Sequence, residues 1–163
     1  MNLNPKRDNK MKKVLMTFIA LSVSMCSLYS QQYKTIKGRV ISEFFETIPG
    51  VSITINDTVE VGRTDLNGFF QIDIPVSEKR ISFGSVGLYP TTIEFVDNCD
   101  KIEVVMMLSC TDDFITLKRA ERIRNKRYKK LPEIHKQAFE KGIFETEYAC
   151  YKCEFKPFYL QEN

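Results

Sequence analysis

Hydrophobic and polar positions alternate along short stretches of the chain between residues 33 and 108. In residues 51–55, for example, Val51, Ile53 and Ile55 alternate with Ser52 and Thr54. A period of two places successive side chains on opposite faces of a β-strand, so each stretch predicts a strand with one buried face. The same reading predicts strands at residues 36–40, 70–74, 81–83 and 93–95, and a further strand is expected at residues 59–63. Residues 102–107 are apolar on both faces near their end, as expected of a strand that is covered on both sides.

These stretches together predict the fold class. About seven short strands follow one another at a spacing of roughly ten residues, which is typical of a two-sheet sandwich. No segment between them is long enough for the crossover helix that ordinarily joins parallel strands. We therefore expect a mainly β domain at residues 31–110, namely a seven-stranded antiparallel β-sandwich with an aliphatic and aromatic core.

Turn residues stand between the predicted strands. Pro49-Gly50 predicts a bend before residues 51–55. In residues 65–68, Asp stands at the start of a tight turn and Gly stands where a positive φ is required. The residues to which we assign structural roles in turns are Pro49, Gly50, Asp65, Asn67, Gly68 and Gly87.

Residues 111–163 have a different pattern, which predicts a helical C-terminal region that is basic at first and then rich in Cys and aromatic residues. A helix is expected at about residues 114–130, capped by Asp112 or Asp113. Pro132 then begins a second short helix that ends near Gly142. Residues 145–158 fit either a hairpin or an extended segment. An apolar stripe that could dock the first helix on the sandwich consists of Leu117, Ala120 and Ile123.

The N-terminus has the pattern of a secretory signal peptide at residues 1–30. Lys12 and Lys13 form a positive region, residues 14–23 are largely apolar, and small, mildly polar residues follow. The apolar stretch is shorter than the ~20 residues that a membrane-spanning helix needs. Met11 is a possible true start, and cleavage is expected after Ser30. The alternative is a lipoprotein anchored through Cys26, although Met25 stands where such signals have a small residue.

The net charge changes once the leader is set aside. The full chain has 24 basic and 21 acidic residues. Five basic residues and one acidic residue precede residue 31, so 19 basic and 20 acidic residues remain after the leader. A nearly neutral exported protein is not expected to bind nucleic acid. The remaining cations are concentrated in residues 118–130, as a solvated helix face or as a contact for a polyanion or an anionic membrane. The candidate contacts are Lys126, Arg127, Lys129 and Lys130.

Four short motifs carry a resemblance to a known family. They are Ile36-Lys37-Gly38-Arg39-Val40, then residues 48–53 from Ile48-Pro49-Gly50, then Thr64-Asp65-Leu66-Asn67-Gly68-Phe69-Phe70, and then residues 81–87 ending in Val86-Gly87. In this order, over residues 33–108, the chain resembles the carboxypeptidase regulatory-like domain. It departs from the family at Phe44-Phe45 and at Leu88. The resemblance implies a transthyretin-like sandwich without catalytic residues, in a stand-alone exported bacterial protein.

Candidate catalytic and metal-ligating residues are few. His135 is the only histidine, so the two His ligands of a zinc peptidase cannot be assembled, and we expect His135 to lie at the surface of a short helix. Cys99 and Cys110 flank the last predicted strand and are not expected to pair with each other. A disulfide would join one of them to Cys150 or Cys153, or would join those two. Unpaired thiols, a metal site and a redox pair remain the alternatives.

The sequence therefore favours a non-catalytic, exported binding or scaffolding protein of the bacterial cell envelope, in the periplasm or at the outer membrane, without a cofactor. Its expected partner is an envelope protein or a glycan. The alternatives are a carbohydrate- or polyanion-binding module and an enzyme of unrecognised type. For a carbohydrate, the candidate surface residues are Phe44, Phe45, Phe69 and Tyr89.

Overall fold

The computed structural model describes residues 12–17, 32–96, 99, 101–109, 115–155 and 157. The chain forms two compact units, Met1–Gln32 and Tyr33–Asn163. Residues 12–17 of the first unit are helical, whereas Ser30 and Cys26 of the predicted leader lie outside the described residues. No helix among the described residues combines the length and the apolar character that crossing a membrane requires.

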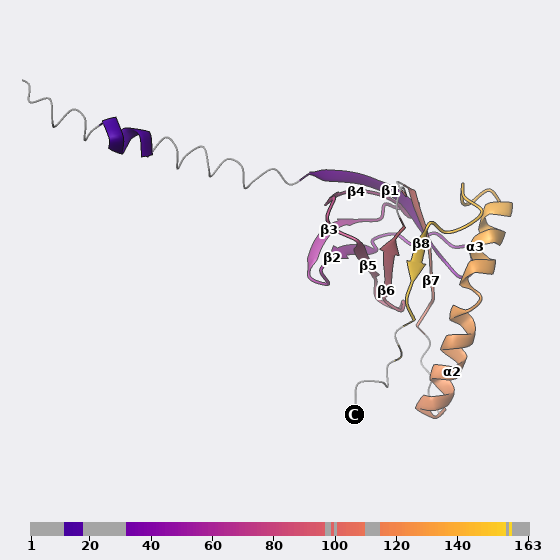
Figure 1. The fold of residues 1–163 in the computed structure, drawn as a ribbon. Coiled ribbons are helices and arrows are strands. Elements are labelled where there is room, and N and C mark those ends of the chain that lie inside the picture. The colour runs from indigo at the N-terminus through magenta and orange to yellow at the C-terminus, as the bar shows by residue number, and fades with distance from the viewer. Residues whose placement is uncertain are drawn as a thin grey trace, which may run out of the picture. The chain divides into compact units, whose positions relative to one another are not determined.

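The second unit is mainly β (Figure 1). Its described residues form eight strands, and two helices lie between the seventh and the eighth strand in the chain. The strands are β1 (Tyr33–Ser42), β2 (Ser52–Ile55), β3 (Val59–Arg63), β4 (Phe69–Pro75), β5 (Arg80–Gly84), β6 (Thr91–Phe95), β7 (Lys101–Met106) and β8 (Tyr151–Cys153). In the described part of the chain they make a three-stranded sheet in the order β4-β1-β7 and a five-stranded sheet in the order β3-β2-β5-β6-β8.

One strand pair corrects the expectation of an all-antiparallel arrangement. β1 and β7 run parallel, with Gly38 opposite Ile102 and Val40 opposite Val104. A parallel pair needs a long connection between its strands, which is usually a helix. Here the intervening chain contains β2 to β6, most of which build the other sheet, and this supplies the return path without a helix.

The C-terminal region is part of the same unit as the predicted sandwich. β8 pairs antiparallel with β6, so that Ile93 lies opposite Cys153 and Phe95 lies opposite Tyr151. Residues 151–153 thus extend the five-stranded sheet at its β6 edge.

Inward-facing side chains of both sheets form one apolar core. Phe70 of β4 meets Phe83 of β5 edge-on, with 5.6 Å between the ring centroids. Gly38 of β1 lies so close to the neighbouring strand that an added Cβ would stand 1.8 Å from the Ile102 carbonyl oxygen. The fully buried members from the strands include Ile36, Val40, Ile53, Ile74, Ile81, Phe83, Ile93, Ile102, Val104 and Met106.

The turns that the sequence marks have the expected backbone conformations. Gly50, Gly68 and Gly87 all have positive φ, between 70° and 79°. Asp65 accepts backbone hydrogen bonds at Oδ1 from Asn67 and Phe69, at 2.9 and 2.8 Å, which closes the turn before β4. The side chain of Asp65 is thus used by the turn itself.

α2 (Leu117–Tyr128) and α3 (Leu131–Glu140) lie between β7 and β8 in the chain. Thr116 occupies the N-cap position of α2, and Asp112 and Asp113 lie outside the described residues. α3 lies against β7 (Figure 1), where Ala138 and Phe144 pack with Ile41 and Val105 in a second apolar cluster. This cluster covers the outer face of the three-stranded sheet.

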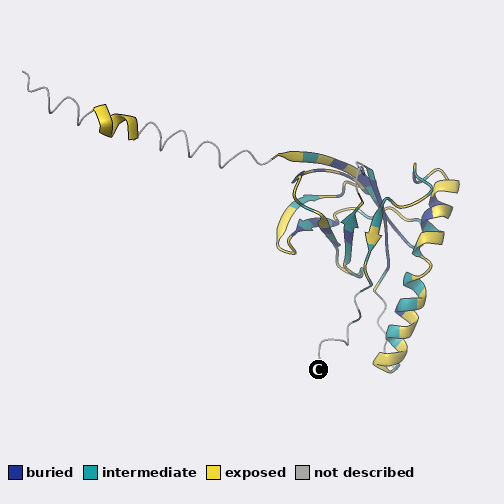
Figure 2. Cartoon of the chain, viewed as in Figure 1, coloured by how far each residue is buried: buried dark blue, intermediate teal, exposed yellow. Residues whose placement is uncertain are grey.

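Two expectations about these helices are wrong. His135 of α3 is only 2% exposed, because it lies on the helix face that turns toward the sheet. Figure 2 shows that α3 carries buried as well as exposed residues. Leu117 and Ile123 of α2 are 62% and 43% exposed, so they are not the docking stripe. The buried position of α2 is Arg124, which the next section describes.

Candidate functional site

One buried and one partly buried carboxylate attach the C-terminal region to the sheets. Glu103 of β7 is 3% exposed and accepts three hydrogen bonds, from the backbone N–H groups of Glu145 and Thr146 at 2.8 and 3.0 Å and from Thr146 Oγ1 at 2.6 Å. A buried carboxylate is stable when such donors replace its lost hydration. Glu103 therefore fixes the segment that leads from α3 to β8.

The second carboxylate, Glu43, fixes the end of α2. Arg127 forms an ion pair with Glu43, in which its Nε lies 3.1 Å from Oε2, and its Nη2 donates to the Leu108 carbonyl at 2.7 Å. Glu43 Oε1 also accepts the Leu108 N–H at 3.1 Å. A guanidinium that bonds both a carboxylate and a carbonyl has a fixed orientation. Arg127 is thus a structural residue.

Tyr128 and a disulfide position β8. The Tyr128 hydroxyl donates to the Cys153 carbonyl, and burial raises the pKa of the phenol. Cys99 and Cys150 form a disulfide with 5.9 Å between their Cα atoms. This is one of the pairings that the sequence left open. β8 is consequently held at both of its ends.

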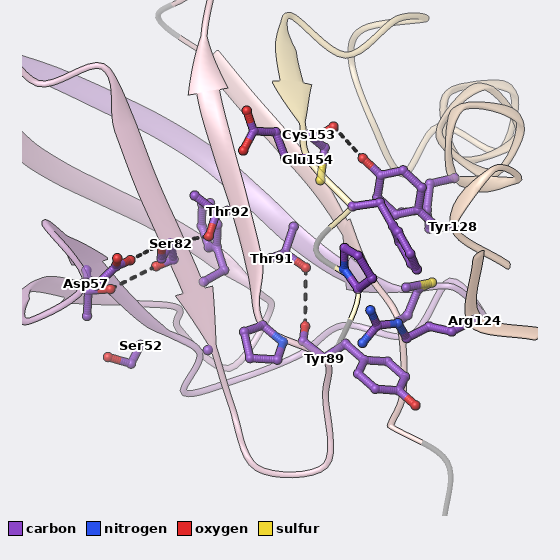
Figure 3. Close-up of a pocket in the computed structure, with 18 residues that line it drawn as sticks. Ser52, Asp57, Ser82, Tyr89, Thr91, Thr92, Arg124, Tyr128, Cys153 and Glu154 are labelled. Atoms are coloured by element: carbon purple, nitrogen blue, oxygen red, sulfur yellow. Dashed lines mark hydrogen bonds between the residues drawn. The ribbon is translucent and has the colours of Figure 1, made fainter. Parts of the chain in front are cut away.

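These contacts build a cleft of about 530 Å³ (Figure 3). Its floor is the outward face of β2, β5 and β6, because the alternation that buries Ile53, Ile81 and Ile93 turns small hydroxyl side chains outward. Its walls come from the loop before β6, from α2 and from the residues after β8. The hydroxyl-bearing lining residues of the floor are Ser52, Thr54, Ser82 and Thr92, and Thr91 lines the cleft at the start of β6.

The polar floor is internally hydrogen-bonded at one end. Ser82 Oγ donates to Asp57 Oδ1 at 3.1 Å and lies 3.0 Å from Thr92 Oγ1. Figure 3 shows these three side chains in a row from β2–β3 toward β6. A row of hydroxyl groups beside a carboxylate can donate and accept hydrogen bonds, as a polar ligand would require.

The other end of the cleft combines a cation with aromatic rings. The guanidinium of Arg124 lies 4.6 Å from the ring centroid of Phe155 and 5.3 Å from that of Tyr89. Arg124 is nearly buried and also donates to Glu121 at 3.3 Å. A cation stacked on rings presents flat apolar faces and directed N–H donors at one place.

The remaining cysteines differ in their surroundings. Cys153 has no disulfide partner in the described part of the chain, and burial raises the pKa of its thiol. A thiol held in its protonated form is a weak nucleophile. Cys110 lies outside the described residues.

The four cations that the sequence suggested as polyanion contacts do not act alike. Lys126, Lys129 and Lys130 are exposed on α2 and just beyond it. Arg127 instead forms the ion pair with Glu43 that fixes the end of α2.

The four aromatic candidates for a carbohydrate surface are dispersed among different contacts. Phe44 is 65% exposed, and Phe69 is half-exposed under the guanidinium of Arg39. Phe45 packs with the cluster beneath α3. Tyr89 lies in the cleft.

Sequence reasoning missed Glu43, Glu103 and Arg124. Glu103 gave a signal, since it is the one carboxylate inside the apolar stretch 102–107 and a strand covered on both faces requires a partner for it. Arg124 gave none, because seven other cations surround it in residues 118–130.

In the part of the chain that the structure describes, no three His, Cys, Asp or Glu side chains are grouped to hold a metal ion.

Comparison with known proteins adds no assignment: no protein-family model matches the chain, and no curated protein matches it.

Proposed function

We propose that the protein is an exported, non-catalytic binding module of the cell envelope, and that the cleft over β2, β5 and β6 holds its ligand or partner. The observation that carries this proposal is the composition of the cleft. A hydroxyl-lined floor, together with the rings of Tyr89 and Phe155 beside the guanidinium of Arg124, provides polar and flat apolar contacts in one concavity. Concave sites with a few directed polar groups are typical of ligand binding.

The fold proposed for this module is a transthyretin-like sandwich of the carboxypeptidase regulatory-like kind. Two sheets that share one core are consistent with it. The motif residues have turn and core roles, which is consistent with the proposal: Gly50 and Gly68 adopt the positive φ of turns and Gly38 permits the close approach of β1 and β7. Residues of this kind serve the fold, and no active site follows from them.

Export is proposed from the leader pattern, and the disulfide between Cys99 and Cys150 is consistent with an oxidising compartment. Intact-mass analysis of the protein purified from a bacterial envelope fraction tests this. The mass expected is that of residues 31–163, whereas the mass of a chain that still includes residues 1–30 would contradict cleavage.

Site-specific photo-cross-linking in intact cells tests the cleft. A photo-reactive amino acid at Ser82 lies on the cleft floor, and one at Thr35 lies on the outward face of β1 and serves as the control. We expect a discrete cross-linked species from position 82 and none from position 35. Absence of an adduct at position 82, or equal adducts at both positions, would argue against the cleft.

A second candidate function, polyanion binding, is favoured by the exposed side of α2 and the residues after it. Six cations are exposed there and the acid Glu121 is turned toward Arg124. The exposed cations are Lys118, Arg119, Arg122, Lys126, Lys129 and Lys130.

The variant that tests this surface is Lys126→Ala/Lys129→Ala/Lys130→Ala, with Arg127 retained because it supports the fold. A matched control removes the same charge elsewhere, as Lys37→Ala/Lys79→Ala/Lys152→Ala at exposed positions. Polyanion binding predicts that only the first variant loses salt-sensitive association with vesicles of anionic lipid or with heparin. Equal behaviour of the two variants would contradict it.

A further inference from the structure

The hydroxyl protons of Ser82 and Thr92 are already used within the cleft floor (Figure 3). Ser82 donates its only proton to Asp57 Oδ1 at 3.1 Å, and an ionised carboxylate only accepts. The contact of 3.0 Å between the hydroxyls of Ser82 and Thr92 therefore uses the proton of Thr92. A hydroxyl has one proton and two lone pairs. Both oxygens thus retain a lone pair for a ligand, and neither retains a proton.

The hydroxyls that β2 contributes to the floor are used in the same way. Thr54 donates to the Ser82 carbonyl at 3.4 Å. Ser52 donates to Glu60 at 2.7 Å. All four hydroxyls of the floor are therefore directed to acceptors of the protein itself, and in this arrangement they meet a ligand as hydrogen-bond acceptors. A group that donates hydrogen bonds is what such a surface matches.

Asp57 adds a negative charge to this row of acceptors. It is exposed, it lines the cleft, and no described cation forms an ion pair with it. The other charged side chains of the lining have counter-charges, since Glu154 lies 3.9 Å from Arg80 and Arg124 lies 3.3 Å from Glu121. Asp57 thus leaves one negative charge at the end of the cleft where the hydroxyl oxygens stand.

We propose that this end of the cleft binds a primary ammonium group, between the carboxylate of Asp57 and the hydroxyl oxygens of Ser82 and Thr92. This inference rests on the proposed function, because it names the chemistry of the ligand that the cleft holds. An ammonium has three donors and no acceptor, and hydrogen bonds from a charged donor to a carboxylate are stronger than neutral ones. A carboxylate or phosphate ligand would be repelled by Asp57 and would find no hydroxyl proton on the floor.

Three five-carbon probes test the proposal: cadaverine has two ammonium groups, 1,5-pentanediol has two hydroxyls and glutarate has two carboxylates. Binding is followed by NMR through the backbone amides of Ser82 and Thr92. Cadaverine is expected to shift them saturably, at least about tenfold tighter than pentanediol, and more weakly as salt is added. Glutarate is expected to give no saturable shift. Equal affinity for cadaverine and pentanediol, or a preference for glutarate, would overturn the proposal.

A fourth probe identifies the source of the ammonium group. N-acetyl-lysinamide carries one ammonium on the side chain of a blocked amino acid, as a lysine of a partner protein would. Tighter binding of this probe than of cadaverine would identify a lysine side chain, and the opposite order would identify a free diamine. Both results require that the shifts occur at the amides of Ser82 and Thr92.

A pair of matched variants locates the ammonium. Asp57→Asn removes the charge and keeps the shape, and Asn tolerates the left-handed backbone of this residue, at φ 58°, as Asp does. It is expected to lose at least about tenfold in affinity for cadaverine and to keep its affinity for pentanediol. Asp73→Asn is the control, because Asp73 is also exposed and accepts from a hydroxyl, Thr35 Oγ1 at 2.6 Å, but lies on the other sheet. Equal losses in the two variants would contradict the site.

The outcomes separate this proposal from the function on which it rests. A cross-linked species from position 82 without any binding of cadaverine or N-acetyl-lysinamide would contradict the ammonium and would leave the cleft as a binding site. Absence of both the cross-link and the binding of all four probes would contradict the two proposals together.

Discussion

At the scale of single residues, the buried polar groups are what the sequence predicted least well. His135 was expected at the surface because single histidines on short helices usually lie there, but α3 turns it toward the sheet. The alternation of apolar residues identified Ile53, Ile81 and Ile93 as core, because each contributes buried area whatever its neighbours are. The role of a buried Glu or His depends on a partner far away in the chain, and local periodicity carries no information about that partner.

Glu103 gives the first residue-scale prediction. Glu103→Ala leaves the N–H groups of Glu145 and Thr146 without their acceptor, and each unsatisfied buried donor costs about 1–3 kcal/mol. We expect the free energy of unfolding, measured by urea denaturation, to fall by about 2–4 kcal/mol. Glu145→Ala is the control, because the ion pair of Glu145 with Lys101 is exposed and should contribute less than about 1 kcal/mol. Equal losses in the two variants would contradict the role of Glu103.

His135 gives a pH dependence. Burial lowers the pKa of His135 below its ordinary value of 6.5 in the folded protein, although the nearby Glu103 acts in the opposite direction. As the pH falls below 6.5, the unfolded chain gains a proton that the folded chain does not, so stability is lost. Between pH 7 and pH 5, the free energy of unfolding of the wild type should decrease more steeply than that of His135→Phe, by up to about 1.4 kcal/mol per pH unit. Parallel curves from urea denaturation would refute the assignment.

At the scale of elements, α2 shows why an apolar stripe is an incomplete guide to packing. Leu117 and Ile123 follow the helical period, yet they are exposed, and the contacts with the rest of the unit come from Arg124, Arg127 and Tyr128. The stems and flat faces of arginine cover apolar and aromatic surface while the guanidinium remains paired. In a run of eight cations, the sequence does not distinguish the two that turn inward from the six that do not.

The disulfide ties β8 to the start of β7 and gives the element-scale prediction. Cys99 and Cys150 are 51 residues apart, and closing a loop of this length restricts the unfolded chain by about 4 kcal/mol in the chain-entropy description. We expect Cys99→Ala/Cys150→Ala to lower the free energy of unfolding by about 3–4 kcal/mol in urea denaturation without reductant.

Two controls accompany this prediction. Cys153→Ala, at the cysteine with a free thiol, should lose about 1 kcal/mol or less. Dithiothreitol should destabilise the wild type and should leave the double variant unchanged. A double variant as stable as the wild type would show that the crosslink contributes nothing.

At the scale of the whole molecule, the strands were predictable and their assembly was less so. Residues 33–108 form seven strands near the expected positions, because the local pattern of apolar and polar residues is sufficient to predict a strand. The parallel pairing of β1 with β7 and the addition of β8 to β6 depend on which edges meet after folding. Residues 151–153 are too few for a periodic pattern. Their place as a strand, and with it a wall of the cleft, could not be read from the sequence.

The extent of the folding unit gives the final prediction. α3 and Phe144 cover Ile41 and Val105 on the outer face of the three-stranded sheet, and β8 covers the edge of β6. A chain of residues 31–110, the domain expected from sequence, would expose both surfaces and lose the disulfide as well. We expect that fragment to lack a cooperative thermal transition by circular dichroism and to bind the dye ANS, whereas residues 31–163 unfold cooperatively. Because Met1–Gln32 is a separate compact unit, deleting residues 1–30 should not change the transition. A fragment of residues 31–110 that unfolds cooperatively near the temperature of the longer chain would show that the two sheets need neither the helices nor β8.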